Sequence, residues 1–199
     1  YGVSQDGTQS TSTTSRGQTM IFRNCKKRTS ITISDSIKPS MVTNIIGDLH
    51  ALKEIKFGAN SEFVIDAPFV FNKDGKTIVY SYADNSKEFI LPAGVENTGN
   101  KLFAYRDFET LYLPDTLKTI GQETFKACVN LKNIIFYQTK ATTIGEGEDA
   151  MTVYSAVLDQ NGKPKAVQSP DEIKLTTIGP YAFMECHALP SFEFYPSIK

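Results

Sequence analysis

Residues 125–136 read FKACVNLKNIIF, and residues 183–194 read FMECHALPSFEF. When the two stretches are aligned, five positions match, at successive offsets of three, three, three and two. The matched pairs are Phe125 and Phe183, Cys128 and Cys186, Leu131 and Leu189, Ile134 and Phe192, and Phe136 and Phe194. A shared apolar spacing in two distant stretches indicates an internal repeat, and such a repeat decides the fold.

The same template recurs in other parts of the chain. Its first strand-forming residue falls at 31, 55, 89, 111, 134 and 192, which gives intervals of 24, 34, 22, 23 and 58 residues. Three intervals agree on a period of 22 to 24 residues, and the two longer intervals indicate insertions. The longest is also expected to contain one divergent coil, with Ile173 and Leu175 as its strand pair.

Both insertions have the pattern of a β-hairpin. The stretches FVFNKDGKTIVYSY (69–82) and TVYSAVLDQNGKPKAV (152–167) alternate apolar and polar residues around Asp-Gly and Asn-Gly. These dipeptides close two-residue hairpins because both residues tolerate positive φ. We therefore expect two hairpins to project from the repeated coils.

Each repeat predicts one coil of a solenoid. Leu111 and Leu113, separated by one residue, form a short strand with both side chains inward. The segment 120–131 has apolar residues at a spacing of three, which favours a short helical or 3₁₀ turn behind the strand. Gly121 and Gly179 allow a tight entry into that turn. Because no unit can bury its inner face alone, the units must stack into a continuous core.

The residues 113–136, LPDTLKTIGQETFKACVNLKNIIF, resemble the BspA-like leucine-rich repeat, which occurs in surface proteins of Bacteroides-type bacteria and of some parasitic protists. The residues 173–194, IKLTTIGPYAFMECHALPSFEF, match the same pattern, and the resemblance covers about residues 19–199. It implies an α/β repeat: a right-handed leucine-rich-repeat solenoid with a parallel ladder of short strands, 3₁₀ or short helical turns on the convex side, and the two inserted hairpins. Residues 1–18, rich in Ser and Thr, are expected to form a tail or cap.

Composition excludes several classes of partner. The 199 residues carry a formal charge of −1, so no overall field attracts nucleic acid or an anionic membrane. No apolar run approaches the roughly 20 residues of a membrane-spanning helix. A signal segment is not visible after Tyr1, so a location at the cell surface or outside the cell is implied by the family resemblance alone.

The cysteines are predicted to be scaffold residues. Cys25, Cys128 and Cys186 share one template position, which Leu49 fills in another copy, so we expect them to be buried, reduced and unbridged. The alternative, a catalytic or metal-binding thiol, lacks partners because only two histidines are present.

Two charged runs could also be binding sites. The acidic run 146–149 lacks the ligand spacing of a calcium loop, and the basic run 23–28 lacks the aromatic residues of a nucleic-acid surface. A solvated turn is favoured for the acidic run and a solvated convex face for the basic run, and we expect no cofactor, no metal and no nucleic acid.

The residue between the two inward positions of each strand is predicted to point to solvent on the concave face. These middle residues are Thr32, Lys56, Ile90, Tyr112, Ile135 and Glu193. The central three are apolar and flanked by charge, a composition typical of a recognition surface. We expect Lys56, Ile90, Tyr112, Ile135 and Glu193 to contact a ligand. Alternatively, the hairpins or residues 1–18 cover this stripe and make it ordinary core.

The resemblance implies a non-enzymatic surface module that binds a host or microbial protein or glycan. A structural spacer within a longer repeat array is the first alternative. An enzyme is the second, and it would need a cleft of convergent titratable groups that the sequence does not provide. The strand at Phe192 and Phe194 leaves a stacking face open, so we expect either further coils or end-to-end association with another copy.

Overall fold

The computed structural model describes residues 12–13, 19–20, 29–38, 41, 52–59, 61–82 and 86–190. The chain divides into two compact units. The first contains residues 1–84 and 99–102, and the second contains residues 85–98 and 103–199. Each unit is described below by itself.

The described strands of the first unit form two pairs and one meander. These strands are β1 (Ser12–Thr13), β2 (Thr19–Met20), β3 (Ser30–Ile33), β4 (Glu54–Phe57), β5 (Phe63–Asp66), β6 (Phe69–Asn72) and β7 (Thr77–Ser81). The β1–β2 pair is antiparallel, the β3–β4 pair is parallel, and β5, β6 and β7 form an antiparallel meander. The pair β6–β7 is the hairpin predicted at 69–82, closed around Gly75 with φ of 70°.

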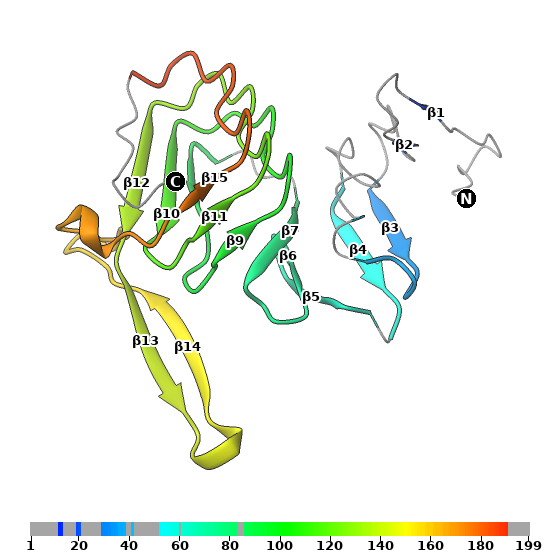
Figure 1. Ribbon diagram of the computed structural model, residues 1–199, viewed down its shortest axis with the longest axis horizontal. Helices are drawn as coiled ribbons and strands as arrows, with labels where there is room; N and C mark the ends of the chain where they lie inside the picture. The colour runs from blue at the N-terminus through cyan, green and yellow to red at the C-terminus, as the bar shows by residue number, and fades with distance from the viewer. Residues whose placement is uncertain are drawn as a thin grey trace. The chain divides into compact units, whose positions relative to one another are not determined.

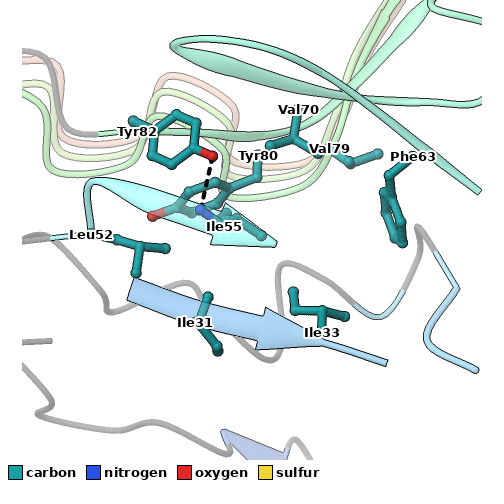
Figure 2. Packing of buried hydrophobic residues seen from close by; sticks show 9 residues of the cluster. All are labelled: Ile31, Ile33, Leu52, Ile55, Phe63, Val70, Val79, Tyr80 and Tyr82. Carbon is teal, nitrogen blue, oxygen red and sulfur yellow. Dashed lines mark hydrogen bonds between the residues drawn. The ribbon is translucent and has the colours of Figure 1, made fainter. Parts of the chain in front are cut away.

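The register of β3 and β4 agrees with the repeat template. Ile31 lies opposite Ile55, so the predicted first strand residues of two successive copies are neighbours. Their side chains join a core with residues of the meander (Figure 2). The Tyr82 hydroxyl accepts a hydrogen bond of 3.1 Å from the backbone N–H of Ile55, which satisfies a polar group inside that core.

The second unit is a solenoid with a parallel ladder. The strands β8 (Glu88–Ile90), β10 (Thr110–Pro114) and β12 (Asn133–Tyr137) lie side by side in the order β12-β10-β8. Phe89 pairs with Leu111, and Leu111 pairs with Ile134. These are the residues that the 22- to 23-residue period aligns, so the predicted solenoid and its register are confirmed.

Two further lines of hydrogen bonds join the same coils. One is a second parallel ladder of short strands, β9 (Asn97–Thr98), β11 (Thr119–Ile120) and β15 (Thr177–Ile178), drawn beside the first ladder in Figure 1. The other runs through the turns, where Phe103 N–H donates to Thr124 and Phe125 N–H donates to Ala182, each at 2.8 Å.

The turns behind the strands form no regular helix, which corrects the prediction of short helical turns, but they contain single 3₁₀-type bonds such as those from Cys128 N–H to Phe125 and from Leu131 N–H to Cys128. Two positions of the turn, four residues apart, repeatedly take a left-handed conformation. In two copies these residues are Glu123 and Ala127, and Tyr181 and Glu185, with φ between 53° and 64°. The alternation directs backbone groups toward the neighbouring coil, as the hydrogen bonds through the turns show. An apolar spacing of three therefore reflects coil stacking here, not a helix.

Aromatic rings stack along the inside of the solenoid. The ring centroids of Phe103 and Phe125 are 5.4 Å apart, and those of Phe125 and Phe183 are 5.2 Å apart. The interplanar angles are 13° and 14°, so equivalent rings of successive coils are nearly parallel. Stacked aromatic pairs contribute beyond their apolar area, so this stack stabilises the packing of successive coils.

Successive stacking of Phe103, Phe125 and Phe183 also corrects the predicted divergent coil. Ile173 and Leu175 are buried but belong to no strand, and β15 pairs directly with β11. Leu175 has the position in its coil that Leu117 has in the coil before, and both are fully buried. The interval of 58 residues is therefore one coil enlarged by a single excursion, residues 138–172.

The excursion contains β13 (Thr139–Ile144), the 3₁₀ turn η1 (Gly147–Asp149), β14 (Met151–Ala156) and the 3₁₀ turn η2 (Pro170–Glu172). The strands β13 and β14 pair antiparallel over six residues and form an arm, residues 139–156, that runs away from the coils (Figure 1). The predicted hairpin at 152–167 is therefore wrong in its strand partner. The loop 145–150 closes the hairpin instead, because Gly145 and Gly147 supply φ of 86° and 64°.

Candidate functional site

The candidate site is the outer face of β8, β10 and β12. Ile90, Tyr112 and Ile135 lie opposite one another in register, so three of the predicted contact residues do form one row. Their exposure differs. The Ile90 side chain is 43% exposed and Ile135 is partly buried, whereas Tyr112 is only 6% exposed. The row is therefore not a continuous exposed stripe, and the prediction that Tyr112 points to open solvent is wrong.

A segment of the excursion, residues 157–167, lies along β12; we call it the cover segment. Gln138 N–H donates to Lys165, Val167 N–H donates to Phe136, and Tyr137 forms an antiparallel bridge with Ala166. These bonds attach the cover segment to the end of the strand ladder. Tyr112, in the middle of the row, is buried, as the alternative of a covered stripe requires.

A tight turn at the tip of the cover segment is held by Asp159. Its carboxylate oxygen Oδ1 accepts backbone hydrogen bonds from Asn161 at 2.8 Å and Lys163 at 3.0 Å. These two N–H groups lower the pKa of Asp159, since they stabilise its charged form. Gly162, with φ of 75°, completes the turn, and Leu158 bridges to Pro164. The Asn-Gly turn predicted from sequence is present, but it closes this short loop.

Lys163 ties the cover segment to the far strand of the ladder. Its Nζ atom lies 2.6 Å from Glu88 Oε1 on β8, while the cover segment itself is attached to β12. The hydrogen bond and charge of Glu88 raise the pKa of Lys163, and Tyr112 adds a smaller effect in the same direction. The lysine thus passes over β10 and Tyr112. Sequence reasoning missed Glu88 and Lys163, because nothing in the period relates residues 75 positions apart.

Of the other predicted contact residues, Lys56 belongs to the first unit. Thr32 and Lys56 are exposed and lie opposite each other on β3 and β4 of the first unit. Lys56 is 3.3 Å from Glu54, a pair exposed to solvent. Glu193 lies outside the described residues.

The thiols lie inside the turns and are poorly suited to chemistry. The Cys128 Sγ atom donates to the carbonyl of Phe103 and the Cys186 Sγ atom to that of Phe125, each at 3.2 Å. Both are free cysteines; Cys128 is fully buried and Cys186 is partly exposed, which corrects the prediction that all three are buried. Burial raises the pKa of Cys128 to about 12, so the nucleophilic thiolate is disfavoured. Cys25 lies outside the described residues.

The charged side chains of the second unit mainly join neighbouring coils. Lys118 pairs with Glu96 and Lys132 pairs with Glu109, each at 2.7 Å. Across the part of the chain that the structure describes, no group of three or more His, Cys, Asp or Glu residues could hold a metal ion. In the same residues, no helix has the length and hydropathy to cross a membrane.

The match to a protein-family model agrees with this repeat architecture. A family model described as the BspA type leucine rich repeat region matches residues 76–148 and 153–199 in six copies. No curated protein matches the chain. A leucine rich cell surface protein from Faecalibacterium prausnitzii is 22% identical, with a TM-score of 0.41 over 64% of this chain and 29% of that one. A leucine-rich repeat protein from Eubacterium ventriosum is 17% identical, with a TM-score of 0.41 over 85% of this chain and 55% of that one.

Proposed function

Because the chain belongs to the BspA-type leucine-rich repeat family, we propose that it is a non-enzymatic recognition module at a cell surface or outside the cell. Its ligand is an extracellular protein or glycan, and the contact surface is the outer strand face of the solenoid. The family match covers more than half of the chain and supports a repeat module. The ligand and the location are part of the proposal.

One observation carries the choice of surface. Ile90 is a large apolar side chain, 43% exposed, in a row whose next member, Tyr112, is buried. Beside it lies the Glu88–Lys163 ion pair, with both side chains about half exposed. An exposed apolar residue rimmed by charged groups is a common arrangement at recognition surfaces. Ile135, partly buried, extends the same surface, and Lys56 and Glu193 are further proposed contacts.

The burial of Tyr112 supports a second candidate, a structural spacer. A covered strand face leaves less surface for a ligand, and the ion pairs Lys118–Glu96 and Lys132–Glu109 serve only to join successive coils. In that case the solenoid would separate other parts of a surface protein and bind nothing itself.

A binding screen with the full chain distinguishes the two candidates. Immobilised extracellular-matrix proteins and a glycan array are the probes. For any probe that binds, Ile90→Ala should weaken binding by about 1 to 3 kcal/mol, the range of interface residues that matter. The matched control is Val129→Ala, because Val129 is exposed to a similar extent, 48%, but lies in a turn behind the strands. Binding that Ile90→Ala leaves unchanged would place the contact surface elsewhere, and no binding to any probe would favour the spacer.

A further inference from the structure

The arm has open edges along both of its strands. Among the described residues, β13 and β14 form a two-stranded sheet of their own. The residues from Lys140 to Ser155 within the two strands are all exposed. An isolated two-stranded ribbon is only marginally stable in water, and an open strand edge is a template for pairing with another chain. The arm is therefore a place where an additional strand would stabilise the protein.

The β14 edge carries none of the features that usually protect an edge. Its sequence, MTVYSA, has no charged residue, no proline and no glycine, and its register with β13 is free of bulges. Large apolar side chains are exposed on one face of the arm. Ile144 pairs with Met151, and Val153 lies on the same face; their exposures are 55%, 60% and 41%. The edge and this apolar face together favour strand addition.

The hydrogen-bond pattern identifies which backbone groups face outward. Val157 N–H donates to Gln138 at 2.9 Å, so these two residues form a hydrogen-bonded pair that continues the arm's register. Such pairs alternate along an antiparallel ladder. The pair of Thr152 and Thr143 is therefore a non-hydrogen-bonded pair, and the backbone groups of both residues point away from the arm.

Charge on the arm is separated between its ends. Glu146, Glu148 and Asp149 are exposed at the tip, and Lys140 and Lys165 are exposed at the base. None of these five forms an ion pair within the part of the chain that the structure describes. The acidic tip of one arm lies beside the lysines of a second arm only when the two arms run antiparallel. This complementarity points to a second copy of the same arm as the partner.

We propose that the arm is a homodimerisation element in which β14 pairs antiparallel with β14 of a second copy. The product is a four-stranded sheet in the order β13-β14-β14-β13. The two-fold axis of such a pair is perpendicular to the sheet, so both arms present the same face on the same side. The apolar faces with Ile144, Met151 and Val153 then join into one stripe, and each acidic tip lies beside the lysines of the other copy. Tyr154, packed against Gly94, orients the arm relative to its own coils.

The edge assignment is tested with proline variants of the full chain. Thr152→Pro removes an outward N–H of β14 without removing a bond to β13, and Thr143→Pro is the matched change on the β13 edge. By sedimentation equilibrium we expect a concentration-dependent dimer for the unchanged chain and for Thr143→Pro. Thr152→Pro should raise the dissociation constant at least about tenfold, which corresponds to 1.4 kcal/mol. Circular dichroism and thermal unfolding check that each variant folds.

Two results would overturn the proposal: an unchanged chain that stays monomeric across the accessible concentrations, or equal dimerisation by Thr152→Pro and the unchanged chain. If Thr152→Pro does not fold, Val153→Lys replaces it, because that side chain is exposed and lies on the apolar stripe. Val153→Lys should also favour the monomer.

The antiparallel orientation is tested by exchanging charges. Lys140→Glu and Glu148→Lys should each weaken the dimer, since each places like charges side by side between the copies. The double variant carries both changes on one chain, restores opposite charges at both ends, and should dimerise more tightly than either single variant. Added salt should weaken the dimer of the unchanged chain. A double variant no better than the single variants, or binding of an unrelated extended peptide by a monomeric chain, would contradict pairing between copies.

Discussion

Residues at equivalent positions of the repeat differ in their exposure on the strand face. Ile90 and Tyr112 are opposite each other in register, yet the first is 43% and the second 6% exposed. Their equivalence could be predicted from sequence, because the period aligns them. The burial of Tyr112 could not, since Lys163 and its segment come from an insertion that does not follow the period.

Substitution of these two residues should therefore have unequal effects on stability. Tyr112→Ala leaves a cavity beneath the cover segment and should cost about 3 kcal/mol or more of the free energy of unfolding, as for other buried aromatic residues. Ile90→Ala should cost about 1 kcal/mol or less, because much of its side chain is already in water. Chemical denaturation measures both. Equal losses would show that the cover segment does not bury Tyr112.

Cys128 is a residue whose scaffold role could be predicted from its template position, and the structure adds a pH dependence. Burial raises its pKa to about 12 from an ordinary value of 9.0. The unfolded chain therefore releases the thiol proton at lower pH than the folded chain does. Stability is fully present below about pH 9 and falls as pH rises toward 12, by about 1.4 kcal/mol per pH unit for one such proton.

The test compares the unchanged chain with Cys128→Ala from pH 7 to pH 10.5. The alanine variant lacks this titration, so its free energy of unfolding should decline less steeply above pH 9 than that of the unchanged chain. Other buried groups with raised pKa values, such as Tyr137, act on both chains alike. Parallel curves for the two proteins would mean that the Cys128 thiol titrates normally in the folded state.

At the level of elements, the strand ladder could be predicted and the turns could not. Two inward residues per strand fix both the position and the register of β8, β10 and β12. The turns have the apolar spacing of a short helix, but their left-handed residues, including Tyr181 with φ of 59°, break the helical path into single turns that are bonded to the next coil. No residue type marks these positions, because neighbouring-coil bonds, not local preference, hold them. Near the arm, the sequence has glycines in two possible turns, 145–150 and 161–162. The Asn-Gly pattern favours the second turn, whereas the first one closes the hairpin of β13 and β14.

Close approach of the coils makes one turn glycine sensitive to substitution. A Cβ atom at Gly179 would lie 2.5 Å from the backbone nitrogen of Gln122 and 2.6 Å from the carbonyl carbon of Gly121. Backbone cannot yield as a side chain can, so Gly179→Ala must separate β15 from β11. We expect a loss of more than about 2 kcal/mol, within the range of overpacking substitutions.

The control for this prediction is Gly75→Ala. Gly75 has φ of 70° and open space around its Cα atom, so alanine meets conformational strain but no steric clash. Its expected cost is about 1 kcal/mol. In thermal unfolding, the midpoint temperature of Gly179→Ala should therefore be well below that of Gly75→Ala. The reverse order would contradict the close packing of the two coils.

For the molecule as a whole, the sequence predicted a repeat fold correctly and miscounted its coils. The interval of 58 residues predicts two coils, whereas the structure has one coil with an excursion. The excursion begins and ends at one residue: Asp115 accepts hydrogen bonds from Thr139 and, through its backbone carbonyl, from Lys174. Because the chain leaves the solenoid and returns to it at the same point, the excursion does not change the spacing of the repeats before and after it. The repeat period therefore cannot distinguish the excursion from an additional coil.

Removal of the excursion should therefore leave the solenoid folded. Replacement of residues 140–172 by a short Gly-Ser link keeps the hydrogen bonds of Thr139 and Lys174 to Asp115, and circular dichroism should retain its strand signal. Loss of the cover segment exposes Tyr112, so binding of a hydrophobic dye should increase. Removal of residues 140–156 alone keeps the cover segment and should not increase dye binding. Unfolding of both deletion variants would show that the excursion is needed for the coils.

The three lines of hydrogen bonds between successive coils also determine how the second unit responds to mechanical force. Every one of these bonds joins a coil only to its neighbours, through the strand ladder, the second ladder and the turns. Tension applied to the two ends of the solenoid would load the interfaces between coils one at a time, except where the Lys163–Glu88 pair and the bond from the Tyr137 hydroxyl to Leu91 join the coil of β12 to that of β8. Each released coil of 22 or 23 residues would lengthen the chain by roughly 70–80 Å. A tether of this kind extends in steps at low force and dissipates energy at each step.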